Sequence, residues 1–325
     1  MGTLVVLHGT GGRLGNRLLL QAHLMAFCLE RPRWRLINFN FVPYAELFEA
    51  SRHHPWMIFP PRRAAGGLLR AATPAGIAAA RAHQRLPARW ASRISRHGTR
   101  LTYRLLGTRA HLLEWGDGRR QDLGEPEFVA RTENLGWFVL GGFWFRDWAA
   151  LERHQETIRA FLRPAAEHVA PAEALLHTLR QRYRTVIGVL VRRTDYAHWL
   201  NGKFFFAPAQ YREWMEQLVR LYGPGTGLLI AGDDPETAAL LDGLPAQLTT
   251  GAAGRPGHYM ESVAALSQCD LIASPPSTFA AMAAFLGDVP IMPLQHAGQT
   301  LRVEDVMTRH LFDAVEHPAF RQAVT

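Results

Sequence analysis

The chain has 325 residues, 48% of them hydrophobic, and carries a formal net charge of +8 at pH 7. The apolar content excludes a disordered chain, and the length predicts two domains with sizeable cores. No stretch is long and apolar enough to predict a membrane span, and the N-terminus lacks the basic region and cleavage site of a signal peptide. Cys28 and Cys269 are the only cysteines. We therefore expect a cytoplasmic protein without a disulfide framework.

The positive charge comes almost entirely from arginine, because Lys203 is the only lysine. A basic balance favours an anionic partner, such as a nucleotide, an anionic membrane surface or nucleic acid. No helix-turn-helix, zinc-finger or aromatic RNA-binding pattern is present, so we do not expect nucleic acid to be the partner.

The N-terminal region begins with a predicted strand over residues 3–8, a glycine-rich turn over 9–17 and a helix over 18–29. This order brings backbone N–H groups and a helix N-terminus to one point, which favours anion binding. The glycine spacing fits neither the dinucleotide fingerprint nor a P-loop, and the next strand, over 34–41, ends without an acidic residue for a ribose. A dinucleotide-binding domain is therefore not expected.

Residues 50–113 contain no Asp or Glu, and arginines recur through them. Their spacing is typical of helices with one basic and one apolar face, which predicts a surface that binds a membrane or an acceptor. The alternative is a helical insertion with a solvated basic face. We favour the insertion, because prolines and glycines interrupt the helical periodicity.

Residues 133–148 combine a predicted strand, a glycine pair and a cluster of aromatic side chains. The cluster predicts either a core or a surface on which a sugar stacks, and a core is the more common outcome. A helix over 152–161 follows, and we expect the second domain to begin after it.

A short apolar run over residues 186–191 predicts a buried strand that ends in Arg192, Arg193, Thr194 and Asp195. The carboxyl edge of a parallel sheet is where ligands bind in open α/β folds. The planar guanidinium of arginine suits a doubly charged oxyanion such as pyrophosphate. The alternative is a solvated loop in which the two arginines pair with Asp195.

Predicted helices over 171–184 and 206–221 precede a strand over 227–231 that leads into Asp233 and Asp234. Paired aspartates are compatible with a metal site. The order Asp, Pro, Glu explains them more simply as a helix N-cap followed by the first turn. We therefore expect no metal here.

A strand over 270–273, a turn that ends in Ser277 and Thr278, and a helix over 279–286 come next. Hydroxyl side chains at a helix N-terminus suit a phosphate. With a last strand over 289–292, the alternation of elements from residue 186 onward predicts a parallel, doubly wound sheet.

Four segments resemble the α-1,2-fucosyltransferases of glycosyltransferase family 11. Residues 12–16 (GRLGN) resemble the family's G-x-L-G-N-Q opening, and 139–161 resemble its G-Y-W/F-Q…I-R…F segment. Residues 188–196 resemble G-V-H-x-R-R-G-D-Y, a motif that α-1,6- and protein O-fucosyltransferases share in a form with Thr in place of Gly. Residues 266–279 resemble the L-x-x-C…N-S-T-F-S-W-W block. The four segments lie in the family's order.

The resemblance implies two Rossmann-like domains in a GT-B-like arrangement, the second of them doubly wound and donor-binding. The first, acceptor-side domain then spans residues 1–165, with the basic helical insertion around 50–130, and the second, which binds the nucleotide sugar, spans 166–325. The resemblance also implies an inverting, metal-independent transfer of fucose from GDP-fucose, with no cofactor.

The resemblance further implies the residues of the site. Arg192 corresponds to the arginine that holds the donor pyrophosphate, where it would neutralise the charge that develops on the departing GDP. Asp195 and His198 are the nearest candidates for the base that takes the proton of the acceptor hydroxyl. Asp195 could equally orient the arginines, and His198 could be an ordinary loop histidine. The expected donor-binding residues are Gly12, Gly15, Asn16, Arg192, Arg193, Ser277, Thr278 and Phe279.

Departures from the family's motifs leave alternatives open. Leu190 stands where the motif has histidine, and Pro276 stands where the serine block has asparagine. The expected function is transfer of L-fucose to a hydroxyl of a glycan acceptor, of the α-1,2 type on a galactoside. One alternative is a degenerate protein that binds a nucleotide sugar or a glycan without turnover. Another is a transferase that uses a different GDP-sugar, such as GDP-mannose.

The sequence does not identify the acceptor. A bacterial-type cytoplasmic chain suggests a lipid-linked oligosaccharide or surface-polysaccharide precursor at the inner face of the membrane. The basic segment over residues 50–113 is compatible with peripheral contact with anionic lipid.

Overall fold

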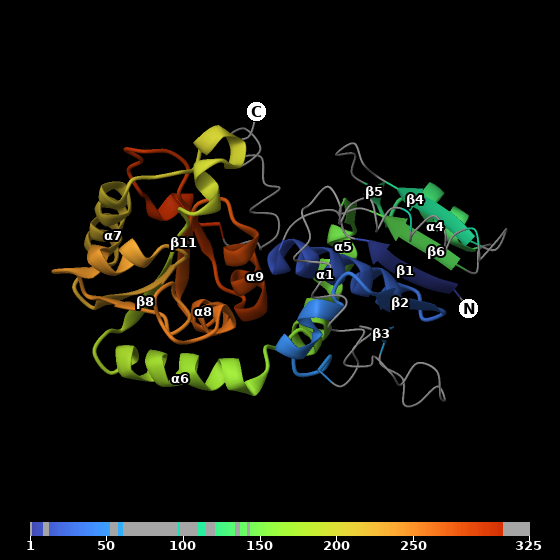
Figure 1. Ribbon diagram of the computed structural model, residues 1–325, viewed down its shortest axis with the longest axis horizontal. Helices are drawn as coiled ribbons and strands as arrows, with labels where there is room; N and C mark the ends of the chain where they lie inside the picture. Colours follow the sequence, from blue (N-terminus) through green and yellow to red (C-terminus); the bar gives the residue numbers. More distant parts are fainter. Residues whose placement is uncertain are drawn as a thin grey trace. The chain divides into compact units, whose positions relative to one another are not determined.

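The computed structural model describes residues 2–8, 13–52, 58–60, 97, 104, 110–114, 121–133, 137–141 and 144–307. Contacts between Cα atoms divide the chain into two compact units, Met1–Arg163 and Pro164–Thr325. Each unit contains a five-stranded, mainly parallel sheet with helices packed on it (Figure 1). The predicted α/β class with two Rossmann-like sheets is confirmed. The boundary after residue 165, as the limit of two independently folding domains, stays a prediction.

The sheet of the N-terminal unit has the strand order β3-β2-β1-β6-β4. Its strands are β1 (Gly2–His8), β2 (Trp34–Asn38), β3 (Ile58–Phe59), β4 (Ala110–Glu114) and β6 (Trp137–Gly141). All the pairs are parallel except β2 with β3. The strand predicted over 34–41 ends at Asn38, because the N–H of Phe41 bonds back to the carbonyl of Asn38 and turns the chain.

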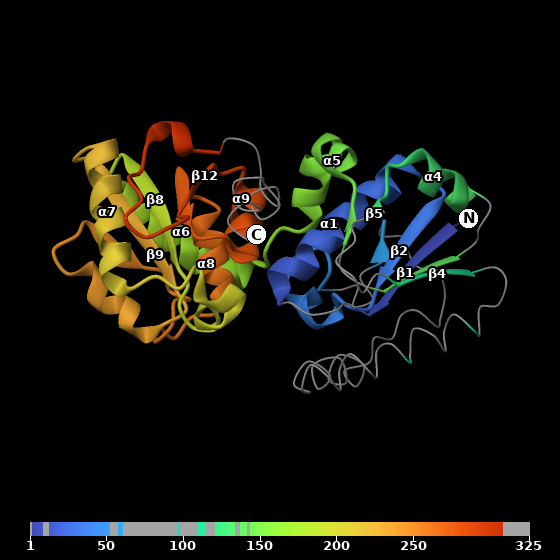
Figure 2. The ribbon, with the colours of Figure 1, turned by 90° about the horizontal axis from the view of Figure 1, so that it is seen from above.

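Helix α1 (Leu14–Glu30) packs on β2 and on α5 (Trp148–Phe161), and Figure 2 shows the two helices side by side. The helix begins at Leu14 rather than at residue 18, so Gly15 and Asn16 lie in its first turn and not in a glycine-rich loop. The smaller elements of this unit are η1 (Val42–Leu47), β5 (Gln121–Asp122), α4 (Pro126–Glu133) and β7 (Phe145–Arg146).

Two described side chains of the aromatic cluster belong to the core of the N-terminal unit, which is the more common of the two predicted outcomes. Phe138 and Phe145 are both completely buried. The glycine pair between them falls partly outside the described residues, as does most of the basic segment over 50–113. A membrane-binding or acceptor-binding face in that segment therefore stays a prediction. Among the helices within the described ranges, none is long and apolar enough to cross a membrane.

The sheet of the C-terminal unit has the strand order β10-β9-β8-β11-β12, and every pair is parallel. Its strands are β8 (Thr185–Val191), β9 (Thr226–Gly232), β10 (Ala246–Leu248), β11 (Leu271–Ser274) and β12 (Ile291–Pro293). The chain runs outward from β8 to β10 and then returns to β11, on the other side of β8. The predicted parallel, doubly wound sheet is confirmed, and its strand order reverses between β8 and β11.

One face of β8 packs on helix α7 (Pro208–Tyr222). Ile187, Val189 and Val191 lie in one core with Trp214 of that helix, because alternate residues of a strand point to the same side. Both faces of this strand are covered, which is why its sequence is a continuous apolar run rather than an alternating one.

The other face of β8 packs on α6 (Ala166–Arg180) and α8 (Tyr259–Leu266). Val186 and Gly188 point to this side. A Cβ atom at Gly188 would lie 2.4 Å from Cδ2 of Leu266, so the close approach of α8 requires glycine at this position. Helices α7 and α9 (Thr278–Gly287) form where the sequence predicts helices.

Helix α6 begins at Ala166, not at Pro171 as the sequence predicted. Proline is most common in the first turn of a helix. Pro171 instead lies inside the helix, where it removes the hydrogen bond that a backbone N–H would donate to the carbonyl of Glu167. Glu167 lies in the exposed first turn, so the lost hydrogen bond costs little. The packing of the rest of α6 on the sheet outweighs this cost.

A capping box closes the N-terminus of α8, with histidine in place of the usual serine or threonine. Nδ1 of His258 accepts the N–H of Met260 at 3.2 Å, and Oε1 of Glu261 accepts the N–H of His258 at 2.9 Å. The ring of His168, in the first turn of α6, stacks on that of His258 with centroids 4.8 Å apart. Partial burial, and then the neighbouring His168, lower the pKa of His258. The cap requires an unprotonated Nδ1.

We expect acid to destabilise the protein through this cap. A histidine whose pKa is lowered by folding binds its proton more tightly in the unfolded chain. Its stabilising contribution is therefore complete above the ordinary pKa of about 6.5 and is lost as the pH falls from there toward the lower folded value. In His258→Ser the cap remains but does not titrate. The drop in Tm from about pH 7.5 to about pH 5.5 should be smaller in His258→Ser than in the wild type, and equal drops would contradict this role.

Candidate functional site

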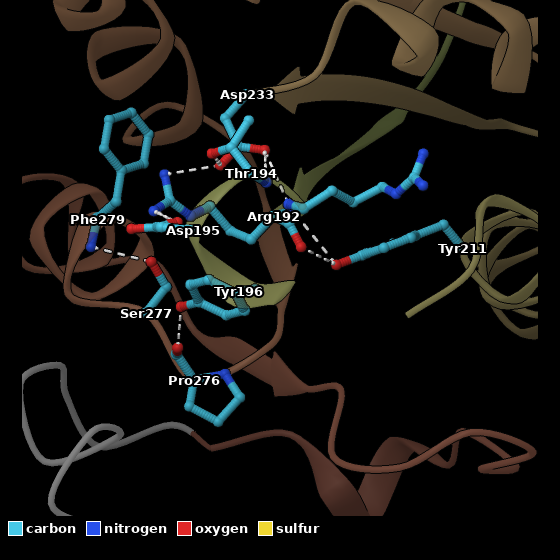
Figure 3. A network of polar contacts seen from close by, with 10 residues as sticks. Arg192, Thr194, Asp195, Tyr196, Tyr211, Asp233, Pro276, Ser277 and Phe279 are labelled. Atoms are coloured by element: carbon cyan, nitrogen blue, oxygen red, sulfur yellow. Dashed lines mark hydrogen bonds and ion pairs between the residues drawn. The ribbon is translucent and has the colours of Figure 1, made fainter. Parts of the chain in front are cut away.

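The site begins at the carboxyl end of β8, where Arg192 directly follows the last strand residue. The hydroxyl of Tyr211, from α7, accepts the N–H of Arg192 at 3.1 Å and donates to its carbonyl oxygen at 3.2 Å (Figure 3). Burial raises the pKa of Tyr211, which keeps its phenol protonated and able to donate. The backbone of Arg192 is therefore fixed on both sides of its Cα atom.

The side chain of Arg192 is held by two carboxylates and an aromatic ring. Its Nη2 lies 2.6 Å from Oδ1 of Asp195, and its Nη1 lies 3.2 Å from Oδ2 of Asp233. Its Cζ lies 5.1 Å from the ring centroid of Tyr196. The side chain is only 15% exposed, so it is not the solvated arginine of the alternative prediction, although it does pair with Asp195. Among the described residues, its buried Nε makes no hydrogen bond.

Asp233 organises the loop that carries Arg192. Besides the ion pair with Arg192, its Oδ1 accepts the N–H of Arg193 at 2.8 Å, and its Oδ2 accepts the hydroxyl of Thr194 at 2.7 Å. Asp233 reaches this position because Val191 at the end of β8 pairs with Gly232 at the end of β9. The carboxylate thus ties the loops after two neighbouring strands together.

The two adjacent arginines bind different carboxylates. Nη1 of Arg193 lies 3.0 Å from Oδ2 of Asp234 and 2.9 Å from Oε2 of Glu236, and its Cζ lies 5.4 Å from the ring centroid of Phe205. Arg193 is therefore held beside η6 (Pro235–Leu241), away from the pair formed by Arg192 and Asp195. Its contact with a donor stays a prediction.

The loop after β11 meets the loop after β8. The hydroxyl of Tyr196 donates to the carbonyl oxygen of Pro276, and burial raises the pKa of Tyr196 to about 12, so the phenol stays protonated. Oγ of Ser277 accepts the N–H of Phe279 at 3.2 Å and caps α9 (Figure 3). Thr278 is the first residue of that helix and is half-buried. The structure therefore brings these predicted phosphate-binding residues next to the loop of Arg192.

The remaining predicted residues lie in different places. The side chain of Asp195 is 44% exposed and forms an ion pair with Arg192. His198 is exposed, and its backbone N–H donates to the carbonyl oxygen of Asp195 at 3.2 Å. Gly15 and Asn16 lie in α1 of the other unit. Gly12 lies outside the described residues. The role of each of these residues at a donor stays a prediction.

The sequence analysis did not predict the roles of three residues in the site. These are Asp233, Tyr211, and Tyr196 with its hydroxyl as a hydrogen-bond donor. Asp233 was taken with Asp234 as a helix cap, but only Asp234 caps, because its Oδ1 accepts the N–H of Glu236 at 2.9 Å. Within the described part of the chain, no three of His, Cys, Asp and Glu gather as metal ligands would.

In open α/β sheets, ligands bind outside the carboxyl ends of the strands where the strand order reverses. Here that point lies between β8 and β11. Arg192 follows the first of these strands, and the capped N-terminus of α9 follows the second. A guanidinium and a helix N-terminus together suit a diphosphate. The fold and the site thus define a doubly wound α/β protein whose switch point holds groups that suit an anion.

Comparison with known proteins places this fold more narrowly. No protein-family model matches the sequence, and no curated protein matches it. A mutant of FUT1 from Arabidopsis thaliana, solved in complex with GDP, matches over 93% of this chain and 72% of that chain, with a TM-score of 0.54 and 13% identity. The fucosyltransferase NodZ from Bradyrhizobium matches over 92% of this chain and 97% of that chain, with a TM-score of 0.50 and 17% identity. The chain has the GT-B-like fold of these fucosyltransferases.

Proposed function

We propose that this chain is a glycosyltransferase that moves L-fucose from GDP-fucose to a hydroxyl of a glycan acceptor. One observation carries the proposal: the loop that carries Arg192 meets the loop that leads into the capped N-terminus of α9, where the strand order reverses. These groups bind diphosphates well. The fold is shared with two fucosyltransferase structures, one of them in complex with GDP, which supports this donor.

The proposed reaction is a direct displacement at the anomeric carbon. The acceptor oxygen forms the new glycosidic bond while the bond from the sugar to the pyrophosphate breaks, so the configuration inverts. Negative charge grows on the departing GDP, and Arg192 and the N-terminus of α9 stabilise it without a metal ion. The acceptor hydroxyl gives up a proton, for which Asp195 and His198 are the candidate bases.

Calorimetric titration without divalent metal tests the donor. We expect GDP-fucose to bind, and GDP-mannose to bind at least about tenfold more weakly, because the site would discriminate between the two sugars. Binding of both with equal affinity would favour a transferase for another GDP-sugar. If neither bound, the fucosyltransferase proposal would be wrong.

A specific observation supports the alternative function, in which the protein binds a nucleotide sugar or a glycan without turnover. Leu190, at the position of the motif histidine, is buried, and the carbonyl of Pro276 is engaged by Tyr196. Neither position offers the polar side chain that the family motif has there. Release of GDP from GDP-fucose in the presence of β-galactosides separates the two functions: donor binding without any release over hours would support the alternative.

The finer features of the reaction belong to the proposal as well. The α-1,2 linkage to a galactoside rests on the resemblance to glycosyltransferase family 11. A lipid-linked or surface-polysaccharide acceptor, with peripheral contact at the inner membrane face, rests on the basic segment over 50–113. Co-sedimentation with anionic liposomes tests this contact, and a protein that stays in the supernatant at low salt would count against it.

A further inference from the structure

Two large aromatic side chains are exposed in the loop that joins β8 to α7. Trp199 is 39% exposed and Phe205 is 40% exposed. Phe205 lies between the buried Phe204 and Phe206, so its side chain points outward as theirs point inward. Its ring faces the guanidinium of Arg193, and this cation–π contact also accounts for its position. Trp199 has no such polar partner among its described ring contacts.

The backbone around Trp199 is unusual. Leu200 and Asn201 both adopt left-handed backbone angles, with φ values of 48° and 55°, and Gly202 follows with φ of 78°. Left-handed backbone angles cost free energy for residues other than glycine, and leucine in particular rarely adopts them. Such conformations persist where the surroundings impose them, and they cluster at ligand-binding sites.

A chain of ring contacts connects Trp199 to the anion site. The ring of Trp199 lies 4.9 Å from that of Tyr196, and the ring of Tyr196 lies 5.1 Å from Cζ of Arg192. Trp199 also contacts the completely buried Phe204, with ring centroids 5.7 Å apart. The indole thus packs on two rings while 39% of the residue stays exposed, and it lies two contacts away from the guanidinium.

We propose that Trp199 is the platform on which a neutral pyranose ring of the acceptor stacks; this inference rests on the proposed function. The C–H groups on one face of a pyranose pack well on an aromatic face, and exposed polar groups beside the ring bind its hydroxyls. His198, Asn201 and Lys203 are exposed around Trp199 and supply such groups. A single exposed indole among polar residues fits one sugar ring better than an apolar protein interface, which needs a contiguous patch.

Kinetics with GDP-fucose and lactose as the probe acceptor test the platform. In Trp199→Ala, we expect the KM for lactose to rise at least about tenfold while the Kd for GDP stays within about twofold, and Trp199→Phe should lie between. Leu221→Ala is the control, because Leu221 is 37% exposed at the end of α7, away from this loop. An unchanged KM, or equal losses for lactose and GDP, would overturn the proposal.

A second measurement separates this proposal from the fucosyltransferase reaction. In protein labelled with 5-fluorotryptophan, Trp199→Phe identifies the ¹⁹F resonance of Trp199. Methyl glycosides of galactose, glucose, mannose and N-acetylglucosamine are added to about 50 mM, above the millimolar Kd expected for one stacked sugar. A shift of this resonance with at least one sugar supports the platform even if GDP-fucose is not the donor. No shift with any of the four overturns it.

Discussion

Replacing Arg192 with alanine should weaken the binding of GDP about a hundredfold or more. Truncating one partner of a well-buried, hydrogen-bonded charge pair costs about 3 kcal/mol, and each ~1.4 kcal/mol changes the affinity tenfold. Arg192 meets this description, because its side chain is only 15% exposed and two carboxylates hold it in place. The rate of fucosyl transfer should fall as well, and further than the affinity for GDP-fucose, since the charge on departing GDP is greater than that on the bound donor.

Two further variants define what Arg192 contributes. Arg192→Lys keeps the positive charge but loses the planar fork that binds two oxygens, so we expect an intermediate loss of GDP affinity of about tenfold. Arg180→Ala is the matched control: Arg180 pairs with Asp270 at the amino edge of the same sheet, just before β11. Calorimetry should show Arg180→Ala within about twofold of the wild type. Equal losses in Arg180→Ala and Arg192→Ala would mean that net charge, not a site, determines affinity.

The sequence could predict Arg192 because its position depends on local pattern. A short apolar run gives a buried strand, and whatever follows such a strand lies at the carboxyl edge of the sheet. The same logic predicted the hydroxyl residues at the start of α9, where Ser277 caps the helix. The order of elements was enough to predict a parallel, doubly wound sheet, since crossovers between parallel strands need helices.

What the sequence could not predict depends on contacts between distant elements. The sequence does not distinguish Asp233 from Asp234, because the two are neighbours in one turn. Only the pairing of β8 with β9 places Asp233 beside the loop of Arg192. Tyr211 lies on the buried face of an amphipathic helix, where an aromatic residue is normally core. Its hydroxyl finds the backbone of Arg192 only after α7 has packed on the sheet. The early start of α6, before Pro171, likewise reflects tertiary packing that outweighs a local preference.

Asp233 should also prove important to donor binding, because it holds the guanidinium of Arg192 in place. In Asp233→Ala, Arg192 loses one of its two carboxylate partners, and the N–H of Arg193 loses its acceptor. We expect GDP affinity to fall at least about thirtyfold, because a flexible guanidinium pays more entropy on binding, and we expect Tm to fall as well. In Asp233→Asn one amide oxygen still accepts a backbone N–H, so Tm should fall less while much of the affinity loss remains.

Asp234→Ser is the control that separates a positioning role from a structural one. Serine preserves the N-cap that Asp234 provides for Glu236, while the ion pair with Arg193 is lost. This variant should keep its GDP affinity within about threefold, provided that Arg193 does not itself bind the donor. If Asp233→Ala lowered Tm but left the Kd for GDP unchanged well below Tm, Asp233 would be structural only.

A double-mutant cycle tests directly whether the predicted effects of Asp233→Ala and Arg192→Ala on GDP affinity are coupled. If Asp233 acts by positioning Arg192, removing it from a chain that already lacks Arg192 should cost little further GDP affinity. The coupling between Asp233→Ala and Arg192→Ala should then approach the full effect of Asp233→Ala alone. The two side chains are in contact, with Nη1 of Arg192 at 3.2 Å from Oδ2 of Asp233, so such coupling is physically reasonable. Additive losses would show instead that Asp233 supports the site through the backbone of Arg193 and Thr194, whose N–H and hydroxyl groups it also holds.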